Sequence, residues 1–205
     1  MKGSIDLYEY DKAVRNDYPI FCGVDEAGRG SLAGDVYAAA VILDESTVID
    51  GINDSKKLTP RQRDRLYDEI IERAAAYSIG IATVEEIESL NILEAAMLAM
   101  KRAVDGLSVK PQLAIVDGNR CPTLECECIS VVKGDATSAS IAAASVLAKV
   151  TRDRRMEELA LEYPRWRFEK HKGYGTKLHY EMLDKYGESP IHRHSFLKKY
   201  YAAKK

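Results

Sequence analysis

The sequence is poor in cysteine and has no long apolar run. Four cysteines in 205 residues are too few and too clustered to form a disulfide framework. The longest apolar stretch, near Ala38–Leu43, has the length of a strand rather than of a membrane span. The first residues, MKGSIDLYEYDKAV, lack the apolar segment of a secretory signal peptide. These absences lead us to expect a cytoplasmic protein with no membrane partner.

The cysteines also offer little to a metal site. Cys121, Cys126 and Cys128 follow a C-x4-C-x-C spacing, which indicates zinc only weakly because no fourth ligand lies nearby in the sequence. Cys22 falls within a predicted strand, where we expect it to be a small core residue.

What is present is the composition of a globular protein, with 46% hydrophobic and 30% charged residues. A chain of this length buries roughly 70% of the surface that it would expose when unfolded, so it needs no cross-links. We expect one domain over residues 1–205, with a helical N-terminal lead at about 1–18 and a basic helical part at about 164–205. We also expect a monomer.

Charge is distributed unevenly along the chain. The net charge is −2, yet residues 164–205 hold 11 Lys and Arg against 4 Asp and Glu. Half of the aromatic residues also fall in this segment. A basic segment interleaved with aromatic rings can follow phosphates and stack on sugars or bases. A basic terminus that only keeps the protein soluble is an equal alternative, and composition leaves both open.

Hydrophobic periodicity and turn residues predict strands that come early and then alternate with helices. The strands are expected at Ile20–Val24, Val36–Leu43, Ser78–Val84, Leu113–Val116 and Cys128–Val132. The helices are expected at Asp6–Arg15, Thr59–Tyr77, Ile92 to about Gly106, Ser138–Glu162, Lys177–Tyr186 and from Ser195 onward. This order predicts an α/β fold in which a mixed sheet has helices on both faces.

Acidic residues stand at the ends of several predicted elements. Asp25 ends the first strand, Asp117 ends the fourth, and Asp135 lies just before the long helix. If the first and fourth strands are parallel neighbours, Asp25 and Asp117 emerge side by side, because adjacent strands lie about 4.8 Å apart. Glu26 can join them, since the chain turns at a strand end. Taken alone, each Asp has a commoner interpretation as a turn or cap residue.

Carboxylates gathered in this way repel one another unless cations lie between them. Oxygen ligands suit Mg²⁺ and Mn²⁺, and two such ions roughly 3.5–4 Å apart can hold the attacking and leaving oxygens of a phosphodiester in line. The sequence therefore predicts a site for two divalent ions, Mn²⁺ or Mg²⁺.

Five motifs occur in order between about Phe21 and Phe196: GVDEAGRGSLAGDV, NDSKKL, IVDGN, KGDATSASIAAASVLAKVTRDRRM and HKGYGT. Together they resemble the type 2 ribonucleases H, in the bacterial ribonuclease HII form. The related type 3 enzymes lack the GRG sequence and carry an additional N-terminal domain. The resemblance implies an RNase H-like fold: a five-stranded mixed sheet, flanking helices and a C-terminal helical extension.

The same resemblance implies an activity and its catalytic residues. Members of the family cut the RNA strand of RNA–DNA hybrids and cut at single ribonucleotides within duplex DNA, as in ribonucleotide excision repair. Cleavage on the 5′ side of the ribonucleotide leaves a 3′-hydroxyl and a 5′-phosphate. By the matching motifs, the catalytic and metal-binding residues are Asp25, Glu26, Asp117 and Asp135.

Substrate-binding residues are implied in the same way. The loop Gly28-Arg29-Gly30 matches the family loop that contacts the ribose 2′-hydroxyl, because glycines let the backbone approach a ligand closely. Tyr174 matches a tyrosine that packs on the neighbouring sugar; without the resemblance it would be assigned to the core. Lys56 is expected at a phosphate. The other candidate phosphate ligands are Lys57, Lys149, Arg152, Lys170 and Lys172.

Some assignments stay open at this point. Lys149 and Arg152 are three apart on the long helix and face either the duplex or solvent. The histidines of the basic part are expected to be exposed or to face the duplex; they are His171, His179, His192 and His194. Two other functions remain: a resolvase or integrase-like nuclease, which needs no ribose sensor, and a non-catalytic hybrid-binding module.

Overall fold

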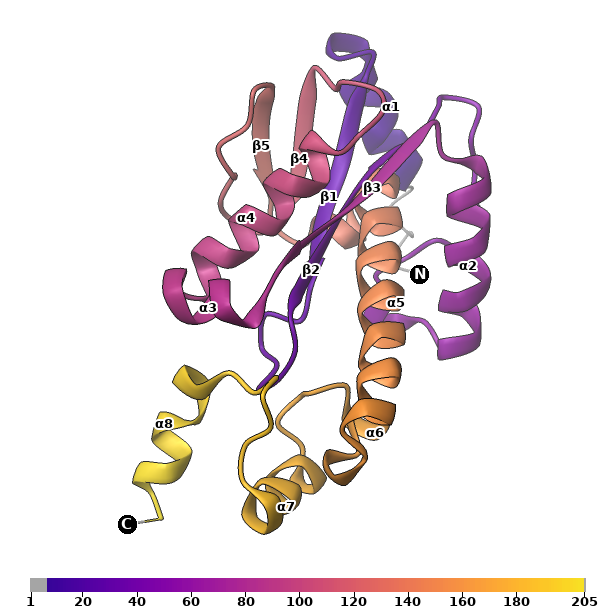
Figure 1. The fold of residues 1–205 in the computed structure, drawn as a ribbon. Coiled ribbons are helices and arrows are strands. Elements are labelled where there is room, and N and C mark those ends of the chain that lie inside the picture. The colour runs from indigo at the N-terminus through magenta and orange to yellow at the C-terminus, as the bar shows by residue number, and fades with distance from the viewer. Residues whose placement is uncertain (1–6, 205) are drawn as a thin grey trace.

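A five-stranded mixed sheet forms the centre of the structure, a computed structural model that describes residues 7–204 (Figure 1). The strands are β1 (Phe21–Ala27), β2 (Val36–Ile42), β3 (Ala76–Ala82), β4 (Leu113–Asp117) and β5 (Glu127–Val131). Their order in the sheet is β3-β2-β1-β4-β5. The pairs β3–β2 and β2–β1 are antiparallel, whereas β1–β4 and β4–β5 are parallel. The predicted mixed sheet is confirmed.

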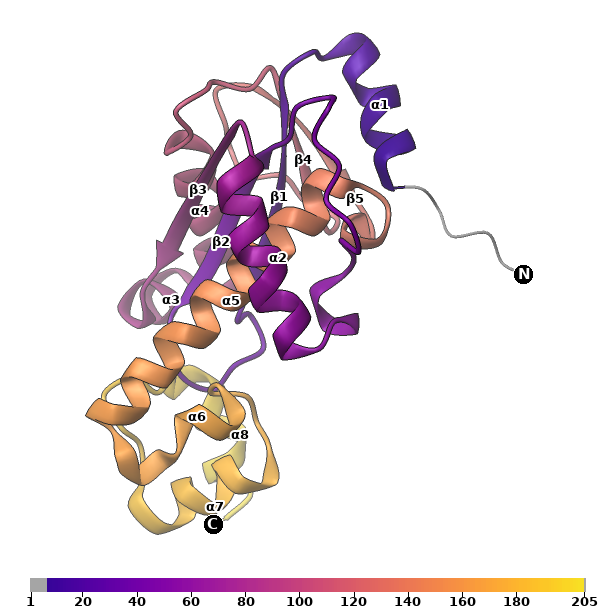
Figure 2. The same cartoon turned by 90° about the vertical axis from the view of Figure 1, so that its right-hand side faces the viewer.

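Helices cover both faces of this sheet (Figures 1 and 2). They are α1 (Leu7–Asp17), α2 (Pro60–Arg73), α3 (Val84–Leu90), α4 (Ile92–Asp105), α5 (Ala139–Glu162), α6 (Phe168–His171), α7 (Lys177–Tyr186) and α8 (His194–Ala202). Side chains alternate along β2, so Ala38 and Ala40 pack toward α4 while Ala39 and Val41 pack toward α5 and α2. Within residues 7–204, no helix is both long and apolar enough to cross a bilayer.

The long helix α5 packs closely against the sheet. Its alanines Ala142, Ala143 and Ala144 are fully buried. At the closest approach, a Cβ atom added to Gly23 of β1 would lie 2.1 Å from the carbonyl carbon of Ser140. Only small residues on both partners allow this packing, and it fixes the position of α5 against β1.

The N-terminus of α2 has a capping box: the Thr59 hydroxyl accepts from the Gln62 backbone amide, and the Gln62 side chain accepts from the Thr59 backbone amide. The predicted end at Tyr77 is wrong. The helix stops at Arg73, because the next residues enter the sheet, where the Ala75 amide donates to the Ile42 carbonyl.

Two short helices were not predicted. α3 begins at Val84, which the sequence placed at the end of a strand, and its capping box joins Thr83 and Glu86. α6 follows the long helix and ends at His171, the first residue of the HKGYGT motif, in a segment for which no helix was predicted.

The C-terminal helices α6, α7 and α8 form a separate cluster beyond the end of the sheet (Figure 1). Its core contains Phe168 together with His171, His179 and His192, all buried. The rings of His171 and His179 stack at 4.1 Å, and Nε2 of His179 lies 3.0 Å from Nε2 of His192. The expectation of exposed or duplex-facing histidines is therefore wrong for these three and holds only for His194, which is exposed.

Candidate active site

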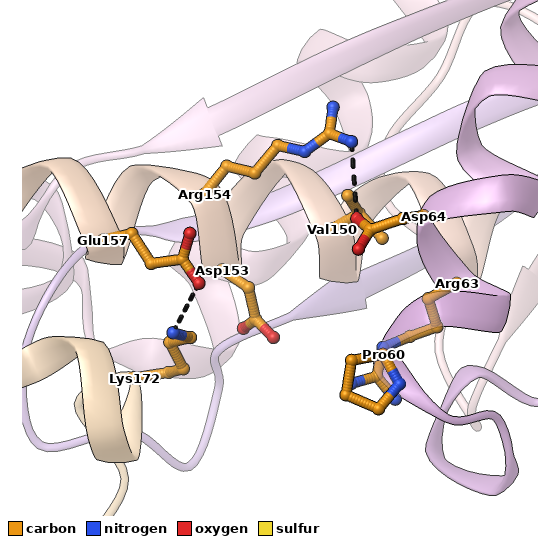
Figure 3. A pocket seen from close by; sticks show the side chains of 8 residues that line it. All are labelled: Pro60, Arg63, Asp64, Val150, Asp153, Arg154, Glu157 and Lys172. Atoms are coloured by element: carbon orange, nitrogen blue, oxygen red, sulfur yellow. Dashed lines mark hydrogen bonds and ion pairs between the residues drawn. The ribbon is translucent and has the colours of Figure 1, made fainter.

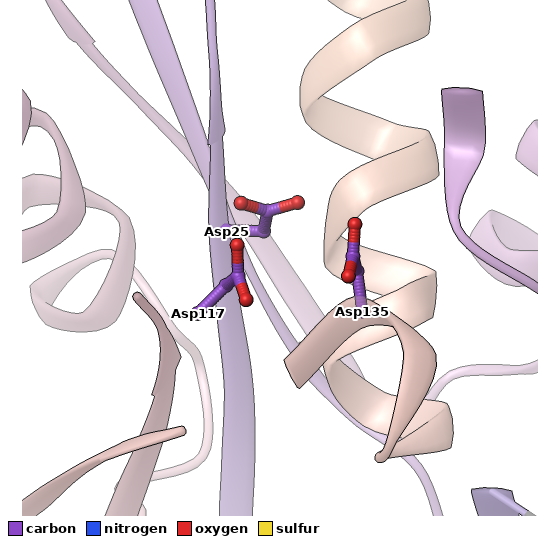
Figure 4. Close-up of side chains that lie close together, drawn as sticks. All are labelled: Asp25, Asp117 and Asp135. Atoms are coloured by element: carbon purple, nitrogen blue, oxygen red, sulfur yellow. The ribbon is translucent and has the colours of Figure 1, made fainter. Parts of the chain in front are cut away.

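Three aspartates from distant parts of the chain meet beside the sheet (Figure 4). Asp25 lies on β1, Asp117 is the last residue of β4, and Asp135 lies in a 3-10 turn, Gly134–Ala136, just before α5. One carboxylate oxygen of each lies within 4.8 Å of the others. Since β1 and β4 are parallel neighbours, the predicted juxtaposition of Asp25 and Asp117 is confirmed. The predicted strand end at Val24 is wrong, because β1 continues to Ala27 and Asp25 pairs with Ala39 of β2.

Two of these three carboxylates, those of Asp25 and Asp117, are held by the local backbone or by a hydroxyl. Oδ1 of Asp25 accepts from the Glu26 amide at 2.7 Å, and Oδ1 of Asp117 accepts from the Gly134 amide at 2.6 Å. The Ser145 hydroxyl on α5 also hydrogen-bonds Asp25 and lies 2.8 Å from the Ser55 hydroxyl. Asp25 and Asp117 are thus oriented before any ligand arrives.

The cluster does not easily carry its full negative charge by itself. Burial raises the pKa of Asp25 well above its ordinary value, and the neighbouring Glu26 and Asp117 carboxylates raise it further. Burial, followed by Asp117 and Asp54, raises the pKa of Asp135 to about 6. Hard divalent cations would remove this repulsion, and the donors present are the oxygens that such cations prefer, so the residues fit a metal site.

Glu26 stands beside this group rather than in it. Its Oε1 accepts from Nη1 of Arg29 at 3.1 Å, and its carboxylate is not one of the three that converge. Burial raises the pKa of Glu26, while Arg29 lowers it. A second cation lies next to Asp135: Nζ of Lys56 is 3.8 Å from its Oδ2. The role of Glu26 as a metal ligand stays a prediction.

A pocket of about 380 Å³ adjoins the aspartates and contains most of the predicted substrate-binding residues. It is lined by Asp25, Glu26, Ala27, Gly28, Arg29, Gly30, Ser55, Lys56, Ser145, Lys149 and Tyr174. The two glycines differ. Gly28 has φ +98° and a Cβ there would lie 2.2 Å from Nε of Arg152, whereas a Cβ on Gly30 would meet no atom within 4 Å. Gly28 is needed for folding, while Gly30 leaves the pocket open.

Tyr174 enters this pocket from the C-terminal helical cluster. It pairs with Ser31 in an isolated bridge, and its carbonyl lies 3.0 Å from Nδ1 of His179. Nζ of Lys149 lies 5.2 Å from the centre of its ring. The pocket therefore has one wall from the sheet and another from the C-terminal helices.

The comparisons with known proteins agree with this site. Residues 22–199 match the family model for Ribonuclease HII. The chain belongs to the ribonuclease HII family. It is 50% identical over 188 residues to Ribonuclease HII of Caldicellulosiruptor bescii, covering 92% of this chain and 91% of the relative. It is 57% identical over 177 residues to that of Dechloromonas aromatica, covering 86% and 90%.

A solved structure gives the same answer for the fold. The crystal structure of ribonuclease H2 from Pyrococcus horikoshii OT3 superposes with a TM-score of 0.73 at 30% identity, over 89% of this chain and 97% of that one. The ribonuclease HII family consists of endonucleases that cleave RNA in RNA–DNA hybrids and use divalent metal ions. The chain is therefore a ribonuclease H enzyme, and its RNase H-like fold is confirmed.

Arg152 departs from the sequence-based expectation for this member of the ribonuclease HII family. The sequence placed it toward the duplex or solvent, but its side chain is fully buried. Its guanidinium donates to the carbonyls of Ala33, Asp35 and Lys172 and to the Ser31 hydroxyl. Because its charge is enclosed beneath the pocket, Arg152 cannot contact a phosphate directly.

The remaining predicted lysines are not gathered with the acids. Nζ of Lys57 lies 3.9 Å from Asp54, outside the pocket. Lys172 lines a second pocket of about 410 Å³ between α2 and α5, where its ammonium donates to Glu157 at 2.8 Å (Figure 3). Lys170 is exposed on α6. Of the five additional candidates, the structure places only Lys149 in the active-site pocket.

Sequence reasoning missed three residues that support the site. Ser145 and Ser55 form the hydroxyl pair beside Asp25, and Arg193 lies fully buried beneath the loop that contains Gly30. A serine one helical turn from other buried positions and an arginine between two histidines carry no distinctive sequence signal.

Proposed function

We propose that this ribonuclease HII chain cuts the RNA strand of RNA–DNA hybrids and also cuts at single ribonucleotides within duplex DNA, on their 5′ side. The products would carry a 3′-hydroxyl and a 5′-phosphate. One observation carries the proposal: the carboxylates of Asp25, Asp117 and Asp135 converge beside a pocket whose wall is the loop Gly28-Arg29-Gly30. Acids for phosphodiester chemistry thus adjoin a backbone that can approach a sugar.

Two divalent ions, Mn²⁺ or Mg²⁺, would be held by Asp25, Glu26, Asp117 and Asp135. When bound, such ions activate a water for attack and stabilise the leaving 3′-oxygen. The chain itself orients the carboxylates through the Glu26 and Gly134 amides. Lys56, close to Asp135 but mostly exposed, is placed to bind a phosphate next to the scissile bond.

We assign recognition of ribose to the loop Gly28-Arg29-Gly30 beside the acids. The open side of Gly30 leaves room for a sugar, and an amide there can bond the 2′-hydroxyl, the group that distinguishes RNA from DNA. The Tyr174 ring would pack on the adjacent sugar, with Lys149 near its face. Arg29, half-exposed and paired with Glu26, would approach a phosphate.

The cellular setting follows from the substrate. We propose a single catalytic domain that acts as a monomer on hybrids and on ribonucleotide-containing duplex DNA, in ribonucleotide excision repair in the cytoplasm. The basic C-terminal part, including exposed Lys170, would add contacts to phosphates.

The test uses one duplex with a single ribonucleotide and the same duplex made only of DNA. The wild-type protein with Mn²⁺ or Mg²⁺ should cut the first at the ribonucleotide and leave the second intact. Equal cutting of both would favour a resolvase-like nuclease that has no ribose sensor.

Asp25→Asn separates catalysis from binding. We expect cleavage to fall by at least about 1,000-fold while binding of the ribonucleotide duplex is kept, because one metal-binding charge is lost and the pocket is unchanged. Asp105→Asn, on the exposed end of α4, is the matched control and should cut at the wild-type rate. Unchanged cleavage by Asp25→Asn would refute the proposed catalytic role of Asp25.

A further inference from the structure

Arg193, immediately before α8, is a fully buried arginine whose acceptors are all neutral. Its Nη1 donates to the carbonyls of Arg29 at 3.1 Å and Ser31 at 2.9 Å, and its Nε donates to the carbonyl of Gly34 at 2.9 Å. A buried charge without a carboxylate partner is costly, and Nη2 has no partner among the described residues. Compensation for lost hydration comes from the hydrogen bonds of Nη1 and Nε. All of them fall on the loop between β1 and β2.

Arginine suits this task because its planar fork can bond several carbonyls at once in fixed directions. Hydrogen bonds from a charged donor are about twice as strong as neutral ones. Burial, helped by the nearby Arg152, lowers the pKa of Arg193 to about 9, so the side chain is still cationic at neutral pH. The loop between β1 and β2 is thus hydrogen-bonded to a cation, Arg193, that lies near the C-terminus of the sequence.

Peptide geometry links this buried contact to the pocket. No peptide bond within residues 7–204 is cis, so the carbonyl of Arg29 and the amide N–H of Gly30 point in opposite directions. The carbonyl points inward to Arg193, and the Gly30 N–H therefore points away from the interior. Gly30 lines the pocket and is exposed, and its amide has no acceptor in the described part of the chain.

We propose that Arg193 is a positioning residue for ribose recognition: by holding the Arg29 carbonyl, it presents the Gly30 N–H to the 2′-hydroxyl oxygen of the substrate. This role rests on the proposed function of the Gly28-Arg29-Gly30 loop. The donor is oriented before the substrate arrives, so binding does not have to order the loop.

The experiment measures how strongly the protein prefers ribose when it cannot cut. In the Asp25→Asn background, Kd is measured for a duplex with one ribonucleotide and for the same duplex made only of DNA. Arg193→Lys is then added. Lysine keeps the charge but cannot hold both carbonyls in one fork. We expect the ratio of the two Kd values to fall about tenfold, the effect of one lost hydrogen bond, while binding of the all-DNA duplex is unchanged.

A control and a milder variant guard against a folding defect. Met100→Ala removes a buried side chain on the opposite face of the sheet and should destabilise the protein without changing the ratio. Phe196→Leu removes the ring that lies 5.2 Å from the Arg193 guanidinium and should lower the ratio by a smaller factor. If Arg193→Lys does not fold, Phe196→Leu alone decides, and an unchanged ratio overturns the proposal.

Hydrogen exchange gives a readout without substrate. The amides of Leu32 and Gly34 donate to the carbonyls of Gly173 and Ile191 at 2.8 Å. In Arg193→Lys these two amides should exchange faster than in Met100→Ala at equal global stability, because the loop has lost the hydrogen bonds that Arg193 donates to it. Equal exchange in these two variants would contradict a positioning role.

The two proposals fail in different ways. If the Asp25→Asn parent binds both duplexes equally, the loop does not read ribose and the proposed function itself is wrong. If the parent prefers ribose and folded Arg193→Lys keeps that preference, only the role of Arg193 is wrong.

Discussion

Two regions of the molecule are packed with different kinds of side chain: the interface between the sheet and α5, and the core of the C-terminal helical cluster. Between the sheet and α5, alanines and Gly23 let backbones approach closely. In the C-terminal cluster, rings fill the core: Phe168 is surrounded by the buried imidazoles of His171, His179 and His192. The first region supplies the carboxylates and the second supplies Tyr174. In the proposed function, catalysis would therefore take place on the part that has the least room to move, and substrate recognition would span the junction between the two regions.

The largest effect is expected from adding one methyl group to the close-packed region. Gly23→Ala places a Cβ 2.1 Å from the backbone of Ser140, and neither partner is a flexible side chain that can turn away. We expect the free energy of unfolding to fall by at least about 3 kcal/mol, measured by urea denaturation. Gly30→Ala is the matched control and should change it by less than about 0.5 kcal/mol, because its Cβ meets open space.

The same control variant tests the pocket. In Gly30→Ala the added methyl group occupies the side from which a sugar would approach, so cleavage at a single ribonucleotide should fall by about 100-fold without loss of stability. Activity and thermal unfolding are measured on the same preparation. Wild-type cleavage by this variant would place ribose recognition elsewhere.

The ring-filled cluster should be sensitive to acid. Burial lowers the pKa of His179 to about 3 and that of His192 to about 4, whereas both are near 6.5 when unfolded. Between pH 6.5 and 4 the unfolded chain binds protons that the folded chain excludes. The stability present above pH 6.5 is therefore lost as pH falls, by about 1 kcal/mol per pH unit for each imidazole.

The measurement is the free energy of unfolding from pH 8 to pH 4.5. His192→Asn should flatten the pH dependence, although it lowers stability at pH 8. His194→Gln, which changes an exposed histidine outside the cluster, should keep the wild-type dependence. An equal slope for His192→Asn and the wild type would show that acid acts elsewhere in the molecule.

The smallest effect is expected on the basic surface of the C-terminal part. Lys170→Glu should weaken substrate binding a few-fold at moderate salt and reduce the salt dependence of Kd, because an exposed phosphate contact is lost. Lys12→Glu on α1, at the opposite end of the molecule, is the control with the same charge change (Figure 1). Identical salt slopes for both variants would mean that Lys170 does not meet phosphates.

The part of the molecule that contains the sheet was predicted well from the sequence, for a physical reason. An apolar run that ends in an acid, as at Val116-Asp117, specifies both a buried strand and a carboxylate at its end. Parallel pairing of β1 and β4 then brings Asp25 and Asp117 together. Short elements were harder, because Val84 fits the end of a strand as well as the first turn of the seven-residue helix α3.

The buried cations and imidazoles could not be predicted in this way. Arginine and histidine are usually exposed or only partly buried, so a basic C-terminal segment suggests a solvated surface. Arg152 and Arg193 are buried because backbone carbonyls of the loop between β1 and β2 surround them, and those acceptors are distant in sequence. Spacing along the chain does not reveal such an arrangement.

The hydrogen bond from Arg193 to the Arg29 carbonyl has a consequence for protein synthesis. Asp25 and Asp117 can meet as soon as β1 and β4 have left the ribosome. Arg152 is translated next and bonds Ser31, Ala33 and Asp35 of the loop beside them, but the Arg29 carbonyl has no partner until Arg193 has been translated and has folded back. A nascent chain would thus hold clustered acids while the peptide group between Arg29 and Gly30 is not yet fixed. The order of translation delays the assembly of a finished nuclease until the polypeptide is almost wholly made.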